Sequence, residues 1–164
     1  MVKRRSFEEG HRRKFLVVVD ETPECDRALS YAAVCAERTS GAVVMLYCIA
    51  LADFQHWLGV ENIMRAEAME EAETTLARAA EKIRAVARID PESVIVEGTL
   101  SSEIIKLIEE DQDIAILVLA AGTSSEGPGP LVSSFASKSA GFFPIPVTIV
   151  PGTPLSDEDI TTLA

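Results

Sequence analysis

Phe15-Leu-Val-Val-Val19, a continuous and largely β-branched apolar run, stops abruptly at Asp20-Glu-Thr-Pro23. A run without polar alternation is typical of a strand that is covered on both faces of a sheet. After the turn, residues from Asp26 to about Thr39 place apolar side chains at helical spacing. The first forty residues therefore predict a buried strand that leads through a short turn into a helix.

The same alternation continues along the rest of the chain. Further apolar runs lie at residues 42–50, 93–96, 114–119 and 147–150, and helical patterns lie at 60–87, 101–110 and 131–140. Strands that are apolar throughout and separated by helices favour parallel pairing. The sequence predicts an α/β fold: a single-domain, doubly wound, Rossmann-like five-stranded parallel sheet with helices on both faces.

The 164 residues fit one domain with two short flanking segments. We expect a basic N-terminal arm at residues 1–13, a domain at 14–150 and a C-terminal tail at 151–164. Six of the 15 lysine and arginine residues precede the first apolar run. Contact with an acidic partner or a membrane surface would explain them, but a solvated leader is the favoured interpretation. In the tail, Leu155 to Ile160 has the cap pattern of a short helix.

Composition excludes several classes of function. The formal charge is 15 − 26 = −11, and so negative a surface repels phosphate backbones, which predicts no nucleic-acid partner. No stretch approaches the roughly 18 apolar residues that span a bilayer, and Phe15 to Val19 is too short for a signal peptide. Cys25, Cys35 and Cys48 are an odd number without CxxC spacing, which indicates free thiols. We expect a cytoplasmic protein without a membrane span.

Polar residues at strand ends are the first candidates for a site. In parallel sheets, ligands bind beyond the carboxyl ends of the strands, where the strand order reverses. This rule points to Asp20, to residues 48–50, to residues 97–100 and to the loop after Leu119. The Asp20 carboxylate could accept hydrogen bonds from a ligand, or it could cap the following helix, and spacing alone does not separate these two roles.

The loop from Gly122 to Ser134 is the second candidate. Its glycines and the helix behind them could form an anion cradle, to which Ser133 and Ser134 would add hydroxyl donors. An ordinary Gly/Ser/Pro loop is the alternative interpretation, and it is favoured by Glu126 and by the absence of Lys and Arg from residues 120–136.

Catalytic and metal sites are not predicted. His11 and His56 are the two histidines, and neither has a second ligand at metal-binding spacing. The chain has no Gly-x-Ser-x-Gly elbow, and no histidine is suitably placed for a Ser-His-Asp triad.

Four segments resemble the universal stress protein family. Residues 18–29 are similar to the family's opening strand, Asp-Gly-Ser turn and Ala-Leu helix start: Asp20, Ala28 and Leu29 match, Thr22 stands for the serine and Glu21 replaces the glycine. Gly98 with Ser101 to Ile105, residues 113–122 and Pro146 to Val150 resemble the exit of its third strand, its fourth strand and its closing strand. The resemblance covers roughly residues 14–150, in the order and spacing of all five strands.

This resemblance implies a site for ATP or AMP, with Mg²⁺ only alongside ATP. Nucleotide-binding members carry two glycines two residues apart, a gap of nine residues, and then Gly-Ser or Gly-Thr. Here Gly122 takes the first place, Ser125 the second, and Ser133-Ser134 lies near the third. The implied ligand contacts are Asp20 and Thr22 on the adenosine side, the Ile49 backbone at the base, and Gly122, Gly127, Gly129, Ser133 and Ser134 in the phosphate loop.

The expected function is that of a non-enzymatic, dimeric stress-response module that binds an adenine nucleotide. The resemblance implies that it dimerises through the last strand, Val147 to Val150. One alternative is a degenerate member that binds protein partners and no nucleotide. Another is slow ATP hydrolysis or self-phosphorylation on Ser124, Ser125, Ser133 or Ser134. A phospho-receiver is disfavoured, because Glu97 and Pro151 stand where that class needs Asp and Lys.

Overall fold

The computed structural model describes residues 3–50, 61–124, 127–136, 141–153 and 155–164. The elements are β1 (Lys14–Val18), α1 (Cys25–Arg38), β2 (Ala42–Ile49), α2 (Glu61–Val86), β3 (Glu92–Glu97), α3 (Leu100–Glu110), β4 (Ile114–Ala120), α4 (Pro130–Ala136), β5 (Val147–Val150) and α5 (Asp157–Leu163). Each predicted strand and helix is found, with ends shifted by a few residues at most. The predicted end of the helix at residues 137–140 lies outside the described residues.

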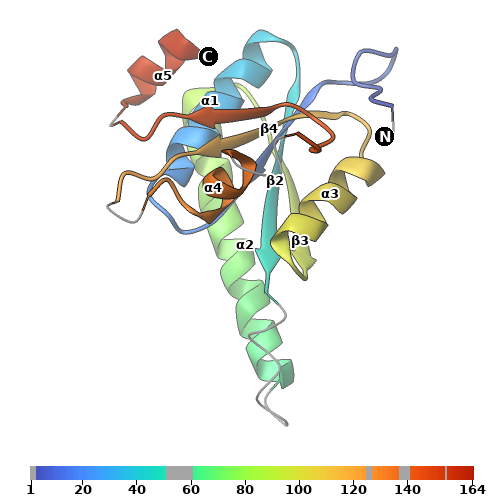
Figure 1. Cartoon of the computed structure of the whole chain (residues 1–164), viewed down its shortest axis with the longest axis vertical. Coiled ribbons are helices and arrows are strands. Elements are labelled where there is room, and N and C mark those ends of the chain that lie inside the picture. Colours follow the sequence, from blue (N-terminus) through green and yellow to red (C-terminus); the bar gives the residue numbers. More distant parts are fainter. Residues whose placement is uncertain (1–2, 51–60, 125–126, 137–140, 154) are drawn as a thin grey trace.

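The strands form one parallel sheet in the order β3-β2-β1-β4-β5 (Figure 1). β1 is the central strand, with Val17 opposite Met45 of β2 on one side and Val118 of β4 on the other. Every pair of neighbouring strands is parallel. The predicted doubly wound five-stranded sheet is therefore confirmed.

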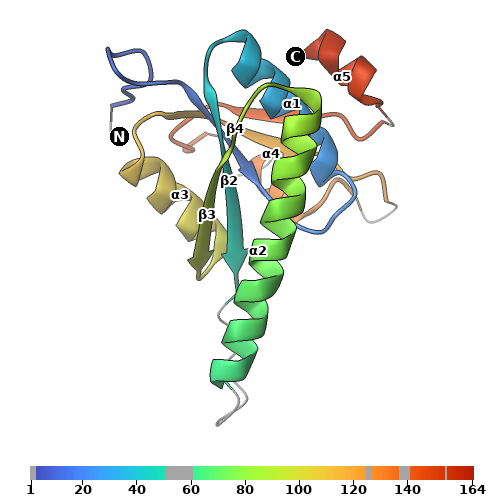
Figure 2. The ribbon, with the colours of Figure 1, turned by 180° about the vertical axis from the view of Figure 1, so that it is seen from behind.

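Helices cover both faces of the sheet (Figures 1 and 2), and alternate residues of β1 belong to different core clusters. Val17 packs in a cluster with α1 and α2, whereas Leu16 packs in a cluster with α3 and α4. Both side chains are 0% exposed. Burial on both faces explains why the strand sequence is apolar without alternation.

The long helix α2 follows the apolar stripe expected from the sequence. Ala72, Leu76, Ala79 and Ile83 are buried at spacings of three and four residues, and three of them belong to the core cluster shared with α1. Figure 2 shows the first turns of α2 extending past the sheet. Among the described residues, no helix is long and apolar enough to cross a membrane.

The N-terminal arm packs against the domain. The Arg4 guanidinium donates to the carbonyl of Ile108 at 2.6 Å and to those of Asp111 and Ile114 at 3.2 and 3.1 Å. It thereby joins the C-terminal end of α3, where the last carbonyls of a helix lack intrahelical partners, to the first residue of β4. Ser6 is buried. Arg4 and Ser6 therefore depart from the expected solvated leader, whereas Lys3, Arg5 and Arg12 are exposed.

The C-terminal tail also returns to the domain. The predicted short helix is confirmed as α5, which begins with a reciprocal capping box between Ser156 and Asp159. α5 packs against α1, and Ser30 of α1 donates to Asp157 at 2.9 Å. Lys82 of α2 also donates to Asp157, at 2.9 Å to Oδ2. The tail thus covers α1 and is joined to two helices of the same layer.

The ion pair of Asp157 predicts a specific dependence of stability on pH. The hydrogen bond from Lys82 lowers the pKa of Asp157, burial opposes this shift, and Ser30 contributes in the same direction as Lys82. A carboxyl whose pKa is lower in the folded protein stabilises the fold above its unfolded pKa and loses that contribution as the pH falls through the folded value. We expect Asp157→Asn to lower the melting temperature at pH 7, and the difference from wild type to close below about pH 4.

Thermal unfolding followed by circular dichroism from pH 7 to pH 3 measures this effect. Glu158→Gln, an exposed carboxylate of the same turn, is the matched control. A difference between wild type and Asp157→Asn that stays constant across the range would contradict the assigned ion pair.

Candidate functional site

The candidate site lies where the chain changes direction in the sheet. From β1 the chain adds β2 and β3 on one side, and it then returns to add β4 and β5 on the other. The carboxyl ends of β1 and β4 therefore form the topological switch point, which is the usual ligand position in open α/β sheets. Asp20 follows β1 at this point, and the loop from Ala121 follows β4.

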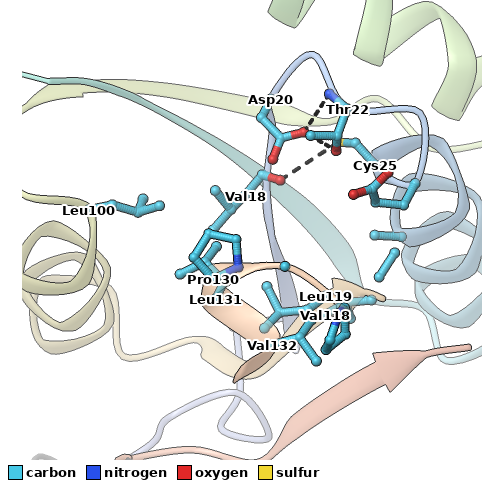
Figure 3. Close-up of a pocket in the computed structure, with 15 residues that line it drawn as sticks. Val18, Asp20, Thr22, Cys25, Leu100, Val118, Leu119, Pro130, Leu131 and Val132 are labelled. Carbon is cyan, nitrogen blue, oxygen red and sulfur yellow. Dashed lines mark hydrogen bonds between the residues drawn. The ribbon is translucent and has the colours of Figure 1, made fainter. Parts of the chain in front are cut away.

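Asp20 stabilises the turn between β1 and α1. Its Oδ1 atom accepts a hydrogen bond from the Thr22 backbone N–H at 2.9 Å and another from the Thr22 hydroxyl. The N-cap residue of α1 is Glu24, whose side chain makes no capping bond. Of the two roles that spacing left open, capping of the next helix by Asp20 is therefore wrong. The exposed carboxylate instead lines a cleft (Figure 3).

Two hollows meet at Asp20 and form one cleft over the strand ends. The first, of about 160 Å³, extends toward the first turn of α4. The second, of about 290 Å³, extends to Tyr47 and Cys48 at the end of β2. Val18, Asp20 and Leu100 line both hollows. The two hollows therefore adjoin over the carboxyl ends of β2, β1 and β4, and together they are called the cleft.

Carboxylates are the charged groups of the first hollow. Asp20 and Glu24 line it, and the described lining residues include no Lys or Arg. Apart from Thr22, the remaining lining comes from apolar side chains and the backbone of Gly129. Glu24 was not among the residues predicted for the site. The one feature of the sequence that could have indicated it is its position in the same turn as Asp20. Any anion that enters the first hollow meets two negative groups.

The second hollow is acidic as well. Glu21 lines it and shares a hydrogen bond with Glu71 of α2, which raises the pKa of Glu71. The neighbouring carboxyl group disfavours ionisation of Glu71.

The thiol and phenol groups of the cleft are protonated at neutral pH. Burial raises the pKa of Cys25 to about 12, and its Sγ lies 3.7 Å from the Val18 carbonyl oxygen. Burial also raises the pKa of Tyr47 and of Cys48. A cysteine is nucleophilic as the thiolate, so a raised pKa disfavours nucleophilic reactivity of these two cysteines.

The loop after β4 is folded on its own backbone. The N–H of Gly122 donates to the Pro128 carbonyl at 2.9 Å, and the N–H of Gly127 donates to the Ser124 carbonyl at 3.1 Å. Gly127 and Gly129 have φ angles of +103° and +106°, a region that side chains with a Cβ rarely adopt. The glycines of this loop therefore serve its compact turn.

The structure brings together part of the expected ligand-binding set. Asp20, Thr22 and Gly129 line the first hollow, whereas Ser133 and Ser134 do not. The Ile49 side chain is buried, and its carbonyl accepts the Gly98 N–H at 3.0 Å. The predicted contact between the Ile49 backbone and a base, and the roles of the two serines, stay predictions.

Metal-binding groups do not gather in the described part of the chain. No set of three or more His, Cys, Asp or Glu side chains there is placed to hold a metal ion. His11 pairs with Asp113 at 2.7 Å, at the amino end of β4 and thus away from the cleft. His56 lies outside the described residues.

Solved structures of other proteins share this fold. The universal stress protein UspA from Lactobacillus plantarum superposes with a TM-score of 0.68 at 16% identity, over 84% of this chain and 97% of that one. A universal stress protein from Archaeoglobus fulgidus in complex with dAMP gives 0.61 at 18% identity, over 84% and 97%. A universal stress protein in complex with cAMP gives 0.58 at 17% identity, over 84% and 95%. No curated protein matches the sequence.

The sequence itself identifies the family. The family model described as the universal stress protein family matches residues 11–151, which include all five strands and the whole cleft around Asp20. This chain belongs to the universal stress protein family.

Proposed function

We propose that this chain is a stress-response module that binds an adenine nucleotide, ATP or AMP, in the cleft around Asp20. The observation that carries the proposal is the pair of adjoining hollows at the switch point, both of which are lined by the Asp20 carboxylate. Relatives of the same fold in complex with dAMP and cAMP support this class of ligand. Both Thr22 bonds end on Oδ1, so we assign Oδ2 of Asp20 as the acceptor for the ribose hydroxyls.

We propose a binding role without catalysis, in the cytoplasm. The protonated state of the Cys25 and Cys48 thiols supports a cleft that holds a ligand without attacking it. Free cysteines in the described chain suit a reducing compartment. One observation favours the alternative of a degenerate member that binds protein partners. Two glycine N–H groups of the loop after β4 donate hydrogen bonds within the loop and therefore do not point at a phosphate.

A thermal-shift series with adenosine, AMP, ADP and ATP, each with and without Mg²⁺, tests the proposed ligand. A ligand at about 100 times its dissociation constant adds roughly 2.7 kcal/mol to the free energy of unfolding. At least one adenine compound should raise the melting temperature, whereas guanosine and cytidine compounds should raise it less. No shift with any adenine compound would contradict the proposal and favour the protein-binding alternative.

We propose that the chain forms a homodimer through β5. This strand is the edge of the sheet, and its Ile149 is 38% exposed, so an apolar side chain lies on an edge strand that a second copy could pair with. We expect Ile149→Lys to shift the mass measured by light scattering after size exclusion from dimer to monomer. Ile105→Lys, on α3 with a similar exposure of 40%, should leave the dimer intact. A wild-type monomer, or an Ile149→Lys dimer, would contradict this interface.

A further inference from the structure

We infer that Glu24 makes this cleft select adenosine over AMP, ADP and ATP, which carry phosphate on the 5′ oxygen. The inference rests on the proposed function, since it concerns which adenine compound the same cleft takes. Glu24 thereby has a role in specificity, and the preferred ligand is adenosine, which carries no phosphate.

The position of the Glu24 carboxylate is the first observation. A Cβ added at Gly122 would lie 2.9 Å from Glu24 Oε1 and 3.5 Å from its Cδ. The carboxylate thus occupies the open face of the glycine that takes the first place in the loop. A glycine-rich loop binds phosphate by letting the anion approach this kind of bare backbone closely. In this chain the negatively charged Glu24 carboxylate already occupies the space beside Gly122 that an anion would need.

The hydrogen bonds of the loop are the second observation. The N–H groups of Gly122 and Gly127 donate to the carbonyls of Pro128 and Ser124, at 2.9 and 3.1 Å. Phosphate cradles depend on backbone N–H groups that point at the anion. A chain of phosphates would therefore have to break bonds of the loop in addition to meeting Glu24.

The composition of the hollow is the third observation. Asp20 and Glu24 are its charged lining residues, and most of the rest is apolar. The Glu24 side chain makes no capping hydrogen bond with α1. A carboxylate accepts hydrogen bonds and donates none, so it suits a hydroxyl group. We assign it to the 5′ end of the ribose, where adenosine carries a hydroxyl and ATP carries its phosphates.

Isothermal titration of the full chain with adenosine, AMP and ATP tests the inference, with Glu24→Gln as the variant. Wild type should bind adenosine most tightly and ATP most weakly. Glu24→Gln removes the charge and keeps the shape, so it should tighten ATP by about tenfold or more and change adenosine by less than about threefold. Asp26→Asn is the matched control, because it removes one exposed negative charge from the same helix start outside the first hollow. It should change both affinities by less than about threefold.

Salt gives an independent readout of the same repulsion. Raising NaCl from about 50 mM to about 500 mM screens charge interactions, so ATP binding to wild type should strengthen more than ATP binding to Glu24→Gln. If wild type prefers ATP and Glu24→Gln leaves that preference unchanged, the inference is wrong while the proposed function stands. If neither protein binds any adenine compound while both keep the wild-type circular dichroism spectrum, the proposed function itself is wrong, and the inference falls with it.

Discussion

We expect Ile160→Ala to lower the free energy of unfolding by about 2–4 kcal/mol, the range typical of a large buried aliphatic side chain replaced by alanine. Ile160 is 1% exposed on α5, the tail helix that packs against α1. The helix is attached near both ends, by Asp157 to Ser30 and by the Ala164 carbonyl to Arg38. Denaturant unfolding of wild type and variant, compared at equal slope, measures the loss.

The size of this loss reports how firmly the tail is docked. If α5 can detach while the sheet stays folded, the cost of the substitution cannot exceed the free energy of docking. Leu163→Ala is the matched control, since Leu163 lies on the same helix and is 55% exposed; it should change stability by less than about 0.5 kcal/mol. Equal effects of the two substitutions would show that Ile160 is not buried in solution.

The elements of the fold could be predicted because the central strands β1, β2 and β4 are largely buried on both faces. Leu16 and Val17 point to opposite layers, so both must be apolar and the strand appears as one uninterrupted run. The order of strands is a different kind of information, because it depends on which strand edges meet. No order of the strands within the sheet was predicted, and the pairing of β1 with both β2 and β4 is a finding of the structure.

The site could be predicted only where position along the chain is informative. Asp20 was found because it follows a buried strand directly. Glu24 was missed because its importance arises from contact with Gly122, a residue far away in the sequence that the sheet brings to α1. The contacts of Arg4 could not be predicted for the same reason. Arg4 donates to a backbone carbonyl near the end of α3, and the positions of backbone acceptors cannot be read from a pattern of side chains.

We expect Asp20→Ala to weaken adenosine binding by about 1–3 kcal/mol, roughly 5- to 150-fold in the dissociation constant. The bound ligand would cover Asp20, and a hydroxyl that loses a charged acceptor in a covered cleft keeps no equivalent partner. The effect on ATP should be smaller, because the substitution also removes a negative charge from the hollow where the phosphates would lie. Titration calorimetry with both ligands measures the two effects separately.

Asp20→Asn separates the contact with the ligand from the turn. Asparagine retains a side-chain oxygen for the Thr22 N–H and hydroxyl, so the turn after β1 should persist while the acceptor becomes neutral and weaker. Its affinity for adenosine should therefore fall between wild type and Asp20→Ala. If the turn alone mattered, Asp20→Asn would bind adenosine as wild type does and Asp20→Ala would also lose stability without ligand. Equal affinities in all three proteins, each natively folded, would place the ligand away from Asp20.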